Sequence, residues 1–259
     1  MLETADFVLL GFAALLAGFI DAVAGGGGLI QVPALFTALP LQAPATLFGT
    51  NKLSSIFGTG SATWRYARKI EICWRIALPA AMTAAVFSFA GAAAVAWLPR
   101  ETVRPLVFGL LLLVIIYTLA QPSLGQSARP AMGAVWERRW SVVLGAALGF
   151  YDGFFGPGTG SFLIFLLVRF FALDFLRASA VAKVVNLATN AAALAYFIPH
   201  GQVLWILGLV MALANITGAQ IGSHLAIRHG SAFVRWIFLA SAILLLTKFG
   251  WDIFSTMVV

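Results

Sequence analysis

The chain has 259 residues, of which 61% are hydrophobic and 10% are charged, and its mean hydropathy is +0.98. Soluble domains are about 45–50% apolar and about 25% charged, so this composition predicts an all-α integral membrane protein and excludes an attached enzyme domain. The net charge of +7 indicates membrane orientation and not nucleic-acid binding, because lysine and arginine gather on one side of a membrane. With one cysteine and three histidines that lack carboxylate neighbours, no disulfide, metal or other cofactor is expected.

Apolar segments follow one another along the whole chain. Residues 1–6 lack the basic flank and the cleavage site of a signal peptide, so the first segment is expected to stay in the membrane as a helix. The segments lie at about 6–24, 29–39, 44–66, 76–98 and 103–121, and then at about 140–155, 160–173, 175–198, 202–227 and 231–255. Segment 29–39 would form about 16 Å of helix, which is too short to cross a bilayer core of about 30 Å alone.

The two sets of segments are copies of one unit of roughly 110 residues. The offset is 131 residues (183 − 52) between Lys52 and Lys183, and it also joins Gly18 with Gly149, Phe19 with Phe150, Asp21 with Asp152, Gly25 with Gly156, Gly27 with Gly158, Gly91 with Gly222 and Arg104 with Arg235. A duplicated membrane unit with one buried charge per copy is typical of a secondary transporter. We predict a first repeat over residues 1–121, a cytoplasmic linker over 122–138 and a second repeat over 139–259.

Basic residues discriminate between two arrangements of the short segments. Either 6–24 and 29–39 form a pair around the glycine break at Gly25–Gly28, as a hairpin or as two thin crossings, or 6–24 spans the membrane and 29–39 lies on its surface. Because basic residues of short loops gather in the cytoplasm, the two arrangements can be compared by their charge distribution. The paired arrangement places 11 basic residues inside and 3 outside, against 8 and 6 for the surface arrangement.

The paired arrangement turns the second copy upside down relative to the first. We therefore predict two inverted-topology repeats, each with a glycine-broken helix pair plus three transmembrane helices. This gives 8–10 membrane segments in total. Both termini are expected on the periplasmic side.

Two lysines lie inside apolar helices, each about 12 Å from the end of its segment. A buried ammonium costs about 2.5–3.5 kcal/mol, so it normally faces a cavity or a partner, unless its side chain reaches back to the interface. Each lysine is followed at i+3 and i+7 by neutral polar residues on the same helical face. The predicted anion-binding residues are Lys52 with Asn51, Ser55 and Thr59, and Lys183 with Asn186 and Asn190.

Each copy also has a glycine break, at 25–28 and at 156–160. A break exposes backbone N–H groups at the start of the next helix, where the helix dipole favours anions. The alternative is that these glycines only allow helices to pack closely. The predicted anion donors at the breaks are Gly27, Gly28, Gly158, Thr159, Gly160 and Gln31.

Asp21 and Asp152 each lie four residues before a glycine break. Carboxylates inside the membrane carry protons in many transporters, so both are candidates for proton coupling. They could equally form ion pairs with Lys183 and Lys52, or cap the broken helices. Separately, the small residues at 91–94 could allow a homodimer.

Four stretches carry a family resemblance: GFIDAVAGGGGLIQVPAL and GTNKLSSIFGTGSATWRYAR in the first copy, and GFYDGFFGPGTGSFLIFLL and SAVAKVVNLATN in the second. They resemble the TauE/SafE family of membrane permeases, also called the sulfite exporter family, and the similarity covers nearly the whole chain. The resemblance implies a carrier in the bacterial inner membrane for sulfite, sulfoacetate or a related sulfur compound. We expect a proton-coupled secondary transporter that exports a small sulfur-containing anion by alternating access. The alternatives are an anion channel, a carrier of another small organic anion, or a membrane scaffold for an enzyme.

Overall fold

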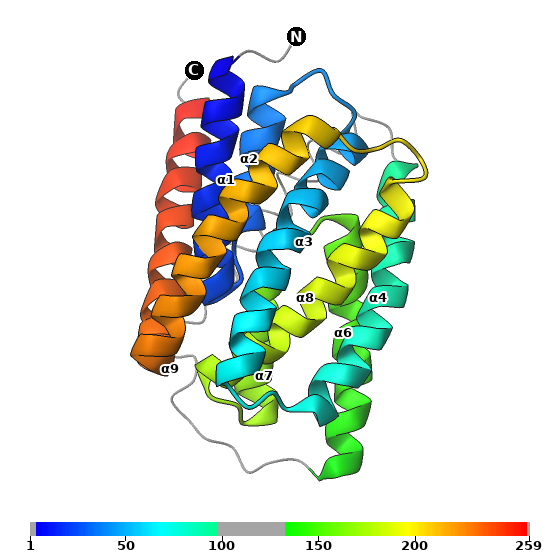
Figure 1. Cartoon of the computed structure of the whole chain (residues 1–259), viewed down its shortest axis with the longest axis vertical. Helices are drawn as coiled ribbons and strands as arrows, with labels where there is room; N and C mark the ends of the chain where they lie inside the picture. The colour runs from blue at the N-terminus through cyan, green and yellow to red at the C-terminus, as the bar shows by residue number, and fades with distance from the viewer. Residues whose placement is uncertain (1–3, 98–132, 258–259) are drawn as a thin grey trace.

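The structure is a computed structural model that describes residues 4–97 and 133–257. These residues form α-helices and no strand, which confirms the predicted all-α class. Figure 1 shows α1 (Thr4–Ala24), α2 (Gly28–Ala38), α3 (Pro44–Lys69), α4 (Trp74–Ala96), α6 (Ala134–Phe154), α7 (Thr159–Phe171), α8 (Phe175–Phe197) and α9 (Trp205–Met257). The predicted segment 103–121 lies outside the described residues, and α6 begins inside the predicted linker, so the end of that linker is helical.

Helix lengths separate the crossing helices from the short ones. Within the described residues, α1, α4, α8 and the part of α9 up to Ile237 are long and apolar enough to cross a membrane. α3 has 26 residues, about 39 Å of helix, but it is less apolar because polar residues of the predicted site lie along it and point into the protein. α2 and α7 have 11 and 13 residues and are too short to cross alone. α9 bends at Gly230, between the two segments expected there.

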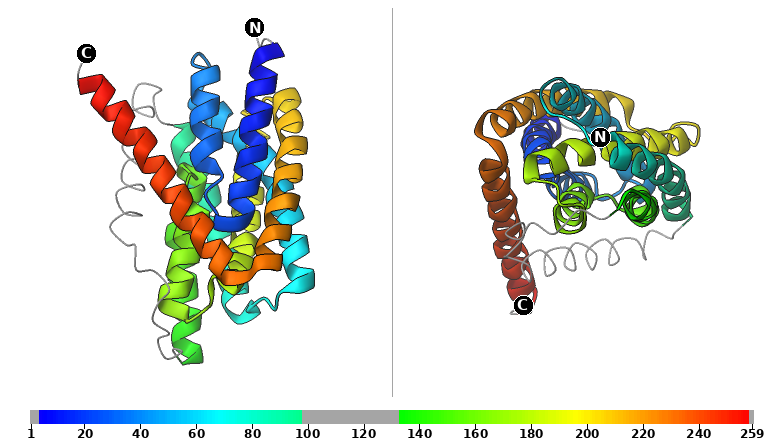
Figure 2. Two further views of the ribbon diagram at one scale, coloured as in Figure 1. Left: turned by 90° about the vertical axis from the view of Figure 1, so that its left-hand side faces the viewer. Right: turned by 90° about the horizontal axis from the view of Figure 1, so that it is seen from below.

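The short helices complete two hairpins that enter the protein from opposite ends (Figures 1 and 2). α1 runs from the end that holds the N-terminus towards the middle, and α2 returns to that end. α6 starts at the other end, and α7 returns there. α3 and α4 likewise run opposite to α8 and the first half of α9, their counterparts 131 residues later. The predicted inverted topology is therefore present, with hairpins and not a surface helix.

Each copy packs its first helix against a helix of the other copy. α1 packs on α9, and the equivalent helix α6 packs on α4. Equivalent glycines make both contacts possible, because a Cβ on Gly222 would lie 2.5 Å from the Phe19 main-chain oxygen, and one on Gly91 would lie 2.3 Å from the Phe150 oxygen. No real Cβ approaches so closely, so these helix backbones touch only because both positions are glycine. The described helices thus pack as two halves related by pseudo-twofold symmetry.

This packing occupies residues that were expected to support a homodimer. Gly91 and Ala92 are buried within the chain, and Gly91 contacts α6. Ala93 and Ala94 keep partly exposed side chains. A homodimer through this segment stays a prediction.

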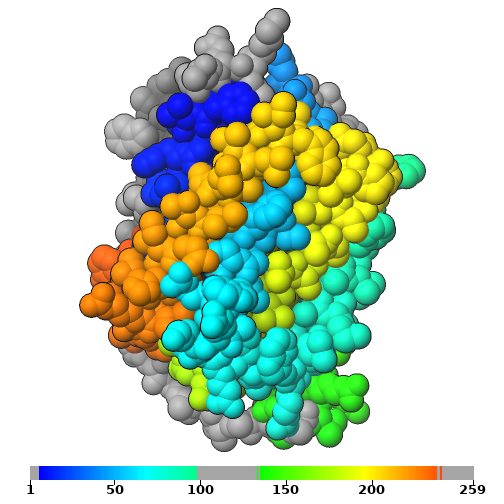
Figure 3. All heavy atoms as spheres, viewed as in Figure 1, coloured from blue at the N-terminus to red at the C-terminus, as the bar shows by residue number. Residues whose placement is uncertain are grey.

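The central helices form a layer in front of the hairpins. α3 and α8 contact each other, α9 packs on α3, and α4 packs on α8. Figure 3 shows these four helices side by side on one face of the molecule, in the order α9, α3, α8 and α4. The polar faces of α3 and α8 point away from this surface and towards the hairpin turns, which places the candidate site in the interior.

Basic side chains gather at one end of the protein. This end, lowest in Figure 1, is where α3 and α7 finish, where α4, α6 and α8 start, and where α9 bends. Apart from the two buried lysines, every basic residue with a described side chain lies near it: Arg65, Arg68, Lys69, Arg75, Arg138, Arg139, Arg169, Arg177, Arg228 and Arg235. We call it the basic end. Its composition agrees with the paired arrangement of the short segments.

Candidate functional site

The two hairpin turns touch each other in the interior. Ser161 at the start of α7 donates its main-chain N–H to the Gly25 oxygen at 3.1 Å and its hydroxyl to the Ala24 oxygen at 2.9 Å. Gly25 also contacts Gly160 directly, since a Cβ on Gly25 would lie 2.3 Å from the Gly160 carbonyl carbon. Gly25 and its equivalent Gly156 have φ values of 78° and 92°, a left-handed conformation that glycine adopts without strain. Glycine therefore serves both the turn and the contact between turns.

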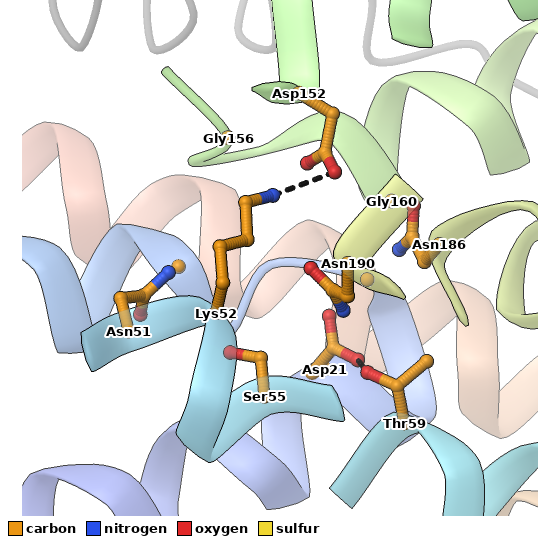
Figure 4. Close-up of a pocket in the computed structure, with 12 residues that line it drawn as sticks. Asp21, Asn51, Lys52, Ser55, Thr59, Asp152, Gly156, Gly160, Asn186 and Asn190 are labelled. Carbon is orange, nitrogen blue, oxygen red and sulfur yellow. Dashed lines mark hydrogen bonds and ion pairs between the residues drawn. The ribbon is translucent and has the colours of Figure 1, made fainter. Parts of the chain in front are cut away.

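Two buried ion pairs join the copies to each other. The Lys52 ammonium of α3 lies 2.6 Å from a carboxylate oxygen of Asp152 on α6, and the Lys183 ammonium of α8 lies 3.0 Å from a carboxylate oxygen of Asp21 on α1. The offset of 131 residues relates each member of one pair to a member of the other. Each lysine is thus neutralised by the aspartate of the opposite copy, which is the ion-pair role that the sequence left open. Figure 4 shows the first of these pairs.

The two pairs differ in what surrounds the lysine. Lys183 is fully buried, and its ammonium also donates to the main-chain oxygen of Asp21. Lys52 has a single hydrogen bond, to Asp152, and its side chain lines a cavity. Because an ammonium has three donors, Lys52 keeps two that are not used by the residues that the structure describes. The sequence repeat is symmetric here, but the site is not.

The cavity next to Lys52 is small and polar. Its volume is about 30 Å³, and its lining comes from both copies (Figure 4). Most of the predicted site residues meet here: Asn51, Lys52, Ser55, Thr59, Asn186, Asn190, Gly28, Gly160, Asp21 and Asp152. Gly25 and Gly156 also line the cavity and were not predicted as ligand-binding residues. The 131-residue offset had already paired them, so their place at the break was visible in the sequence.

The other predicted residues lie outside the cavity lining. Lys183 is held away from it by Asp21, and Gly27 and Gly158 are the residues before α2 and α7. Thr159 donates its hydroxyl to a main-chain oxygen of its own turn. The Gln31 side chain is buried and accepts a hydrogen bond from an amide of α9. Thr159 thus holds its own turn, and Gln31 joins α2 to α9 through its side-chain oxygen, while the Gln31 side-chain nitrogen is buried without a partner among the described residues.

Comparison with known proteins places the chain in a family. The family described as "Sulfite exporter TauE/SafE" matches residues 10–249. The chain belongs to the TauE/SafE family. It is 37% identical over 233 residues to "Probable membrane transporter protein ORF9" of Sinorhizobium sp.. The aligned residues cover 88% of this chain and 87% of that protein. No solved structure matches the chain.

Other relatives carry similar names. "Probable membrane transporter protein YfcA" of Escherichia coli strain K12 is 37% identical over 238 residues, covering 91% of this chain and 87% of the relative. "Probable membrane transporter protein" of Haemophilus influenzae is 34% identical over 237 residues, covering 91% of both chains. This TauE/SafE protein is therefore a multi-pass membrane transporter and not an enzyme.

The charges of the TauE/SafE site sum to zero. Among the described residues, the charged ones that line the cavity are Lys52, Asp21 and Asp152, and Lys183, which lies outside the lining, neutralises Asp21. The amide oxygens of Asn51 and Asn186 are buried at the cavity without a hydrogen-bond partner. Unpaired buried polar groups are costly, so those that line a cavity commonly mark the place of water or a ligand. The site offers hydrogen bonds now, and it can offer a net positive charge only if a carboxylate moves away or takes up a proton.

Proposed function

We propose that this TauE/SafE protein is a secondary transporter of a small sulfur-containing anion, such as sulfite or an organosulfonate like sulfoacetate. The observation that carries the proposal is the Lys52 ammonium, which is buried, lines a polar cavity and has donors to spare. A charged group of this kind inside a membrane protein normally lies on the path of an ion or substrate. The family description supports a sulfur anion and the export direction.

Cavity size and chemistry support an anion of few atoms. A water molecule needs about 10–15 Å³ of such a cavity, so about 30 Å³ holds about two waters. Sulfite, with one sulfur and three oxygens, therefore already requires the helices to separate, and a larger organosulfonate requires it more. Sulfite and sulfonate groups present three oxygens around one sulfur. These oxygens can accept hydrogen bonds from the Lys52 ammonium, the Ser55 and Thr59 hydroxyls and the amides of Asn186 and Asn190.

Competition for Lys52 supports coupling to protons. An anion on the two spare donors of Lys52 would lie beside the Asp152 carboxylate, and repulsion between the two negative charges would push Asp152 off the ammonium. A displaced carboxylate would be buried without a partner, which is unfavourable unless it binds a proton. Anion and proton would then move together. For a singly charged anion this transport is electroneutral, and excess anion inside the cell drives export.

The difference between the two ion pairs supports alternating access. In inverted-repeat carriers, the two halves can exchange conformations about a site near the middle of the membrane. In the exchanged state, Lys183 would line the cavity, and Lys52 would take the fully buried position that Lys183 has here. Each lysine would then bind the anion when the site faces its own side of the membrane. The lysine that does not bind the anion in a given state would stay paired with its aspartate.

Membrane orientation follows from the basic end. Because short cytoplasmic loops are rich in lysine and arginine, we place this end in the cytoplasm of a bacterium, with the chain in the inner membrane. The N-terminus and the end of α9 lie at the opposite end (Figure 1), which would be periplasmic. The small anion and the surrounding lipid are the partners that this proposal requires.

A reconstituted transport assay tests the proposal. Proteoliposomes loaded with sulfite or sulfoacetate should release the anion with saturable kinetics, exchange it with labelled anion outside, and move protons with it. Lys52→Met should abolish the flux. Lys69→Met is the matched control, because it removes an exposed lysine from the same helix, and it should keep the flux.

Two results would count against the carrier. Equal flux in the Lys52 and Lys69 variants would remove the binding site from the cavity. Non-saturating conductance with single-channel steps would replace the carrier by an anion channel.

A further inference from the structure

A second cavity lies at the basic end, on the outside of the helix layer. It has a volume of about 640 Å³ and is formed by the first turns of α4 and α6. Its lining combines guanidinium groups with apolar side chains: Trp74, Arg75, Leu78, Pro79, Met82, Val135, Arg138 and Arg139. We call it the α4–α6 groove. No residue of the candidate anion site contributes to it.

The groove carries an excess of positive charge. Arg75 has one partner, since its guanidinium lies 3.4 Å from a carboxylate oxygen of Glu137. Among the described residues, no carboxylate lies within ion-pair distance of Arg138 or Arg139. The Arg139 guanidinium instead lies 5.9 Å from the ring centre of Trp136. Two arginines at one groove are therefore available for an anionic partner.

The pseudo-twofold axis provides an internal comparison at the other end of the protein. The helices equivalent to α4 and α6 are α9 and α1, which pack together in the same way. Trp205 is equivalent to Trp74, so the tryptophan is kept, but the arginines are not. At the offset of 131 residues, the positions of Arg75, Arg138 and Arg139 are taken by Ile206, Phe7 and Val8. Helix packing does not require the arginines, and they are a property of one end only.

We propose that the α4–α6 groove binds an anionic phospholipid of the adjacent leaflet. Arg138 and Arg139 would hold the phosphate by charge-assisted hydrogen bonds, at the depth where tryptophan marks the membrane interface. Leu78 and Met82 lie one and two turns deeper along α4 than Trp74, and 54% and 64% of these side chains are exposed, which suits an acyl chain and not a free phosphate ion. Basic pockets between helices on the cytoplasmic side bind such lipids in other membrane proteins.

The proposed lipid would bridge the two copies. α4 belongs to the first repeat, and α6 begins the hairpin of the second, so both walls of the groove must keep their spacing for the lipid to stay bound. A lipid seated there would stabilise the α4–α6 contact. This inference does not depend on which anion the carrier transports.

Lipid binding to the purified full-length protein tests the inference. Bound lipids would be counted by native mass spectrometry in detergent with phosphatidylglycerol, phosphatidylcholine or inorganic phosphate added. An arginine near an anionic membrane surface contributes about 1 kcal/mol, which corresponds to about fivefold in binding. We expect the double variant Arg138→Gln/Arg139→Gln to bind phosphatidylglycerol about 25-fold more weakly. The matched control Arg177→Gln/Arg228→Gln removes the same charge from the same end and should bind it as the unaltered protein does.

Three outcomes would overturn the inference. An equal loss in both double variants would mean that the basic end attracts anionic lipid through its total charge and has no groove site. Equal binding of phosphatidylcholine would remove the role of the arginines. If inorganic phosphate bound the groove as strongly as phosphatidylglycerol and lost binding equally in the Arg138→Gln/Arg139→Gln variant, the ligand would be a free anion and not a lipid. Melting temperatures of both variants within about 2 °C of the unaltered protein would show that the comparison is between folded proteins.

Discussion

Replacement of Lys52 by methionine, an uncharged side chain of similar length, would leave the Asp152 carboxylate buried without its partner. The pair is almost fully enclosed, with 3% of the lysine side chain and 7% of the aspartate side chain exposed. Breaking a buried pair on one side costs about 3–5 kcal/mol, whereas replacing both partners by apolar residues is often neutral. We therefore expect Lys52→Met to be strongly destabilising and Lys52→Met/Asp152→Leu to recover most of the lost stability.

Thermal unfolding of the purified variants measures this difference. At about 2–4 °C per kcal/mol, the single variant should lose about 6–20 °C in Tm, and the double variant should return to within about 4 °C of the unaltered protein. Transport should behave differently from stability, because the double variant still lacks the ammonium that binds the anion. We expect it to fold well and to carry no anion.

Asp152→Asn separates the two functions of the pair. It removes the competing carboxylate from Lys52, so added sulfite should raise the Tm more than in the unaltered protein. Anion flux should then lose its link to proton movement. Substantial anion flux in Lys52→Met/Asp152→Leu would refute this reasoning, because the ion pair would then be only structural.

Three further predictions concern packing, substrate contacts and orientation. Gly222→Ala should destabilise the protein by about 1–3 kcal/mol in thermal unfolding because its Cβ would lie 2.5 Å from a main-chain oxygen of α1, whereas Gly11→Ala, with open space around it, should not. Asn186→Leu should lower the kcat/KM of anion flux about 10- to 100-fold, as expected for a lost hydrogen bond to a charged ligand, with Tm little changed. The proposed orientation places Cys73, before α4, in the cytoplasm and Gln42, between α2 and α3, on the periplasmic side. In intact cells, Cys73 should therefore react only with membrane-permeant maleimides, whereas a cysteine at Gln42 in a Cys73→Ser background should react with impermeant ones.

The sequence predicted the architecture well because the duplication and the uneven distribution of basic residues can both be read from residue types and their spacing. The 131-residue offset identified equivalent residues, and the basic loops established the inverted topology. The fate of individual glycines was harder to predict. Gly25 and Gly156 form turns, whereas Gly91 and Gly222 are contact points between helices. Both uses require a missing Cβ, so residue type alone cannot separate them.

The site was predictable as a set of residues but not as a geometry. Offset and helical spacing brought Lys52, Asn186 and Asp152 into one hypothesis, and the cavity joins them. The sequence could not show that Lys183 is closed off while Lys52 faces the cavity, because the two lysines occupy equivalent positions in the repeat. Such a difference arises when two similar halves pack in different conformations, and a carrier needs that difference in order to alternate.

The two ends of the helix layer are closed by different chemistry, which predicts a resting preference. At the basic end, the Arg65 Nε of α3 donates to the Gln220 side chain of α9 at 2.8 Å. The residues equivalent to Arg65 and Gln220 are Tyr196 and Phe89, whose rings meet edge to face at 5.5 Å between α8 and α4. A hydrogen bond from a charged group contributes about 1.5–3 kcal/mol and an aromatic pair about 0.5–1.5 kcal/mol, so the basic end should be harder to open by about 1 kcal/mol.

A difference of about 1 kcal/mol gives a population ratio of about five in favour of the state that is closed at the basic end. The double variant Arg65→Tyr/Gln220→Phe would make the two ends chemically alike and should bring this ratio towards one. A cysteine at Ser55, in a Cys73→Ser background, reports the ratio through its rate of labelling from each side of the membrane. An unchanged labelling ratio would mean that the preference is set elsewhere, because the double variant removes the polar contact between α3 and α9 and leaves the cavity residues as they are.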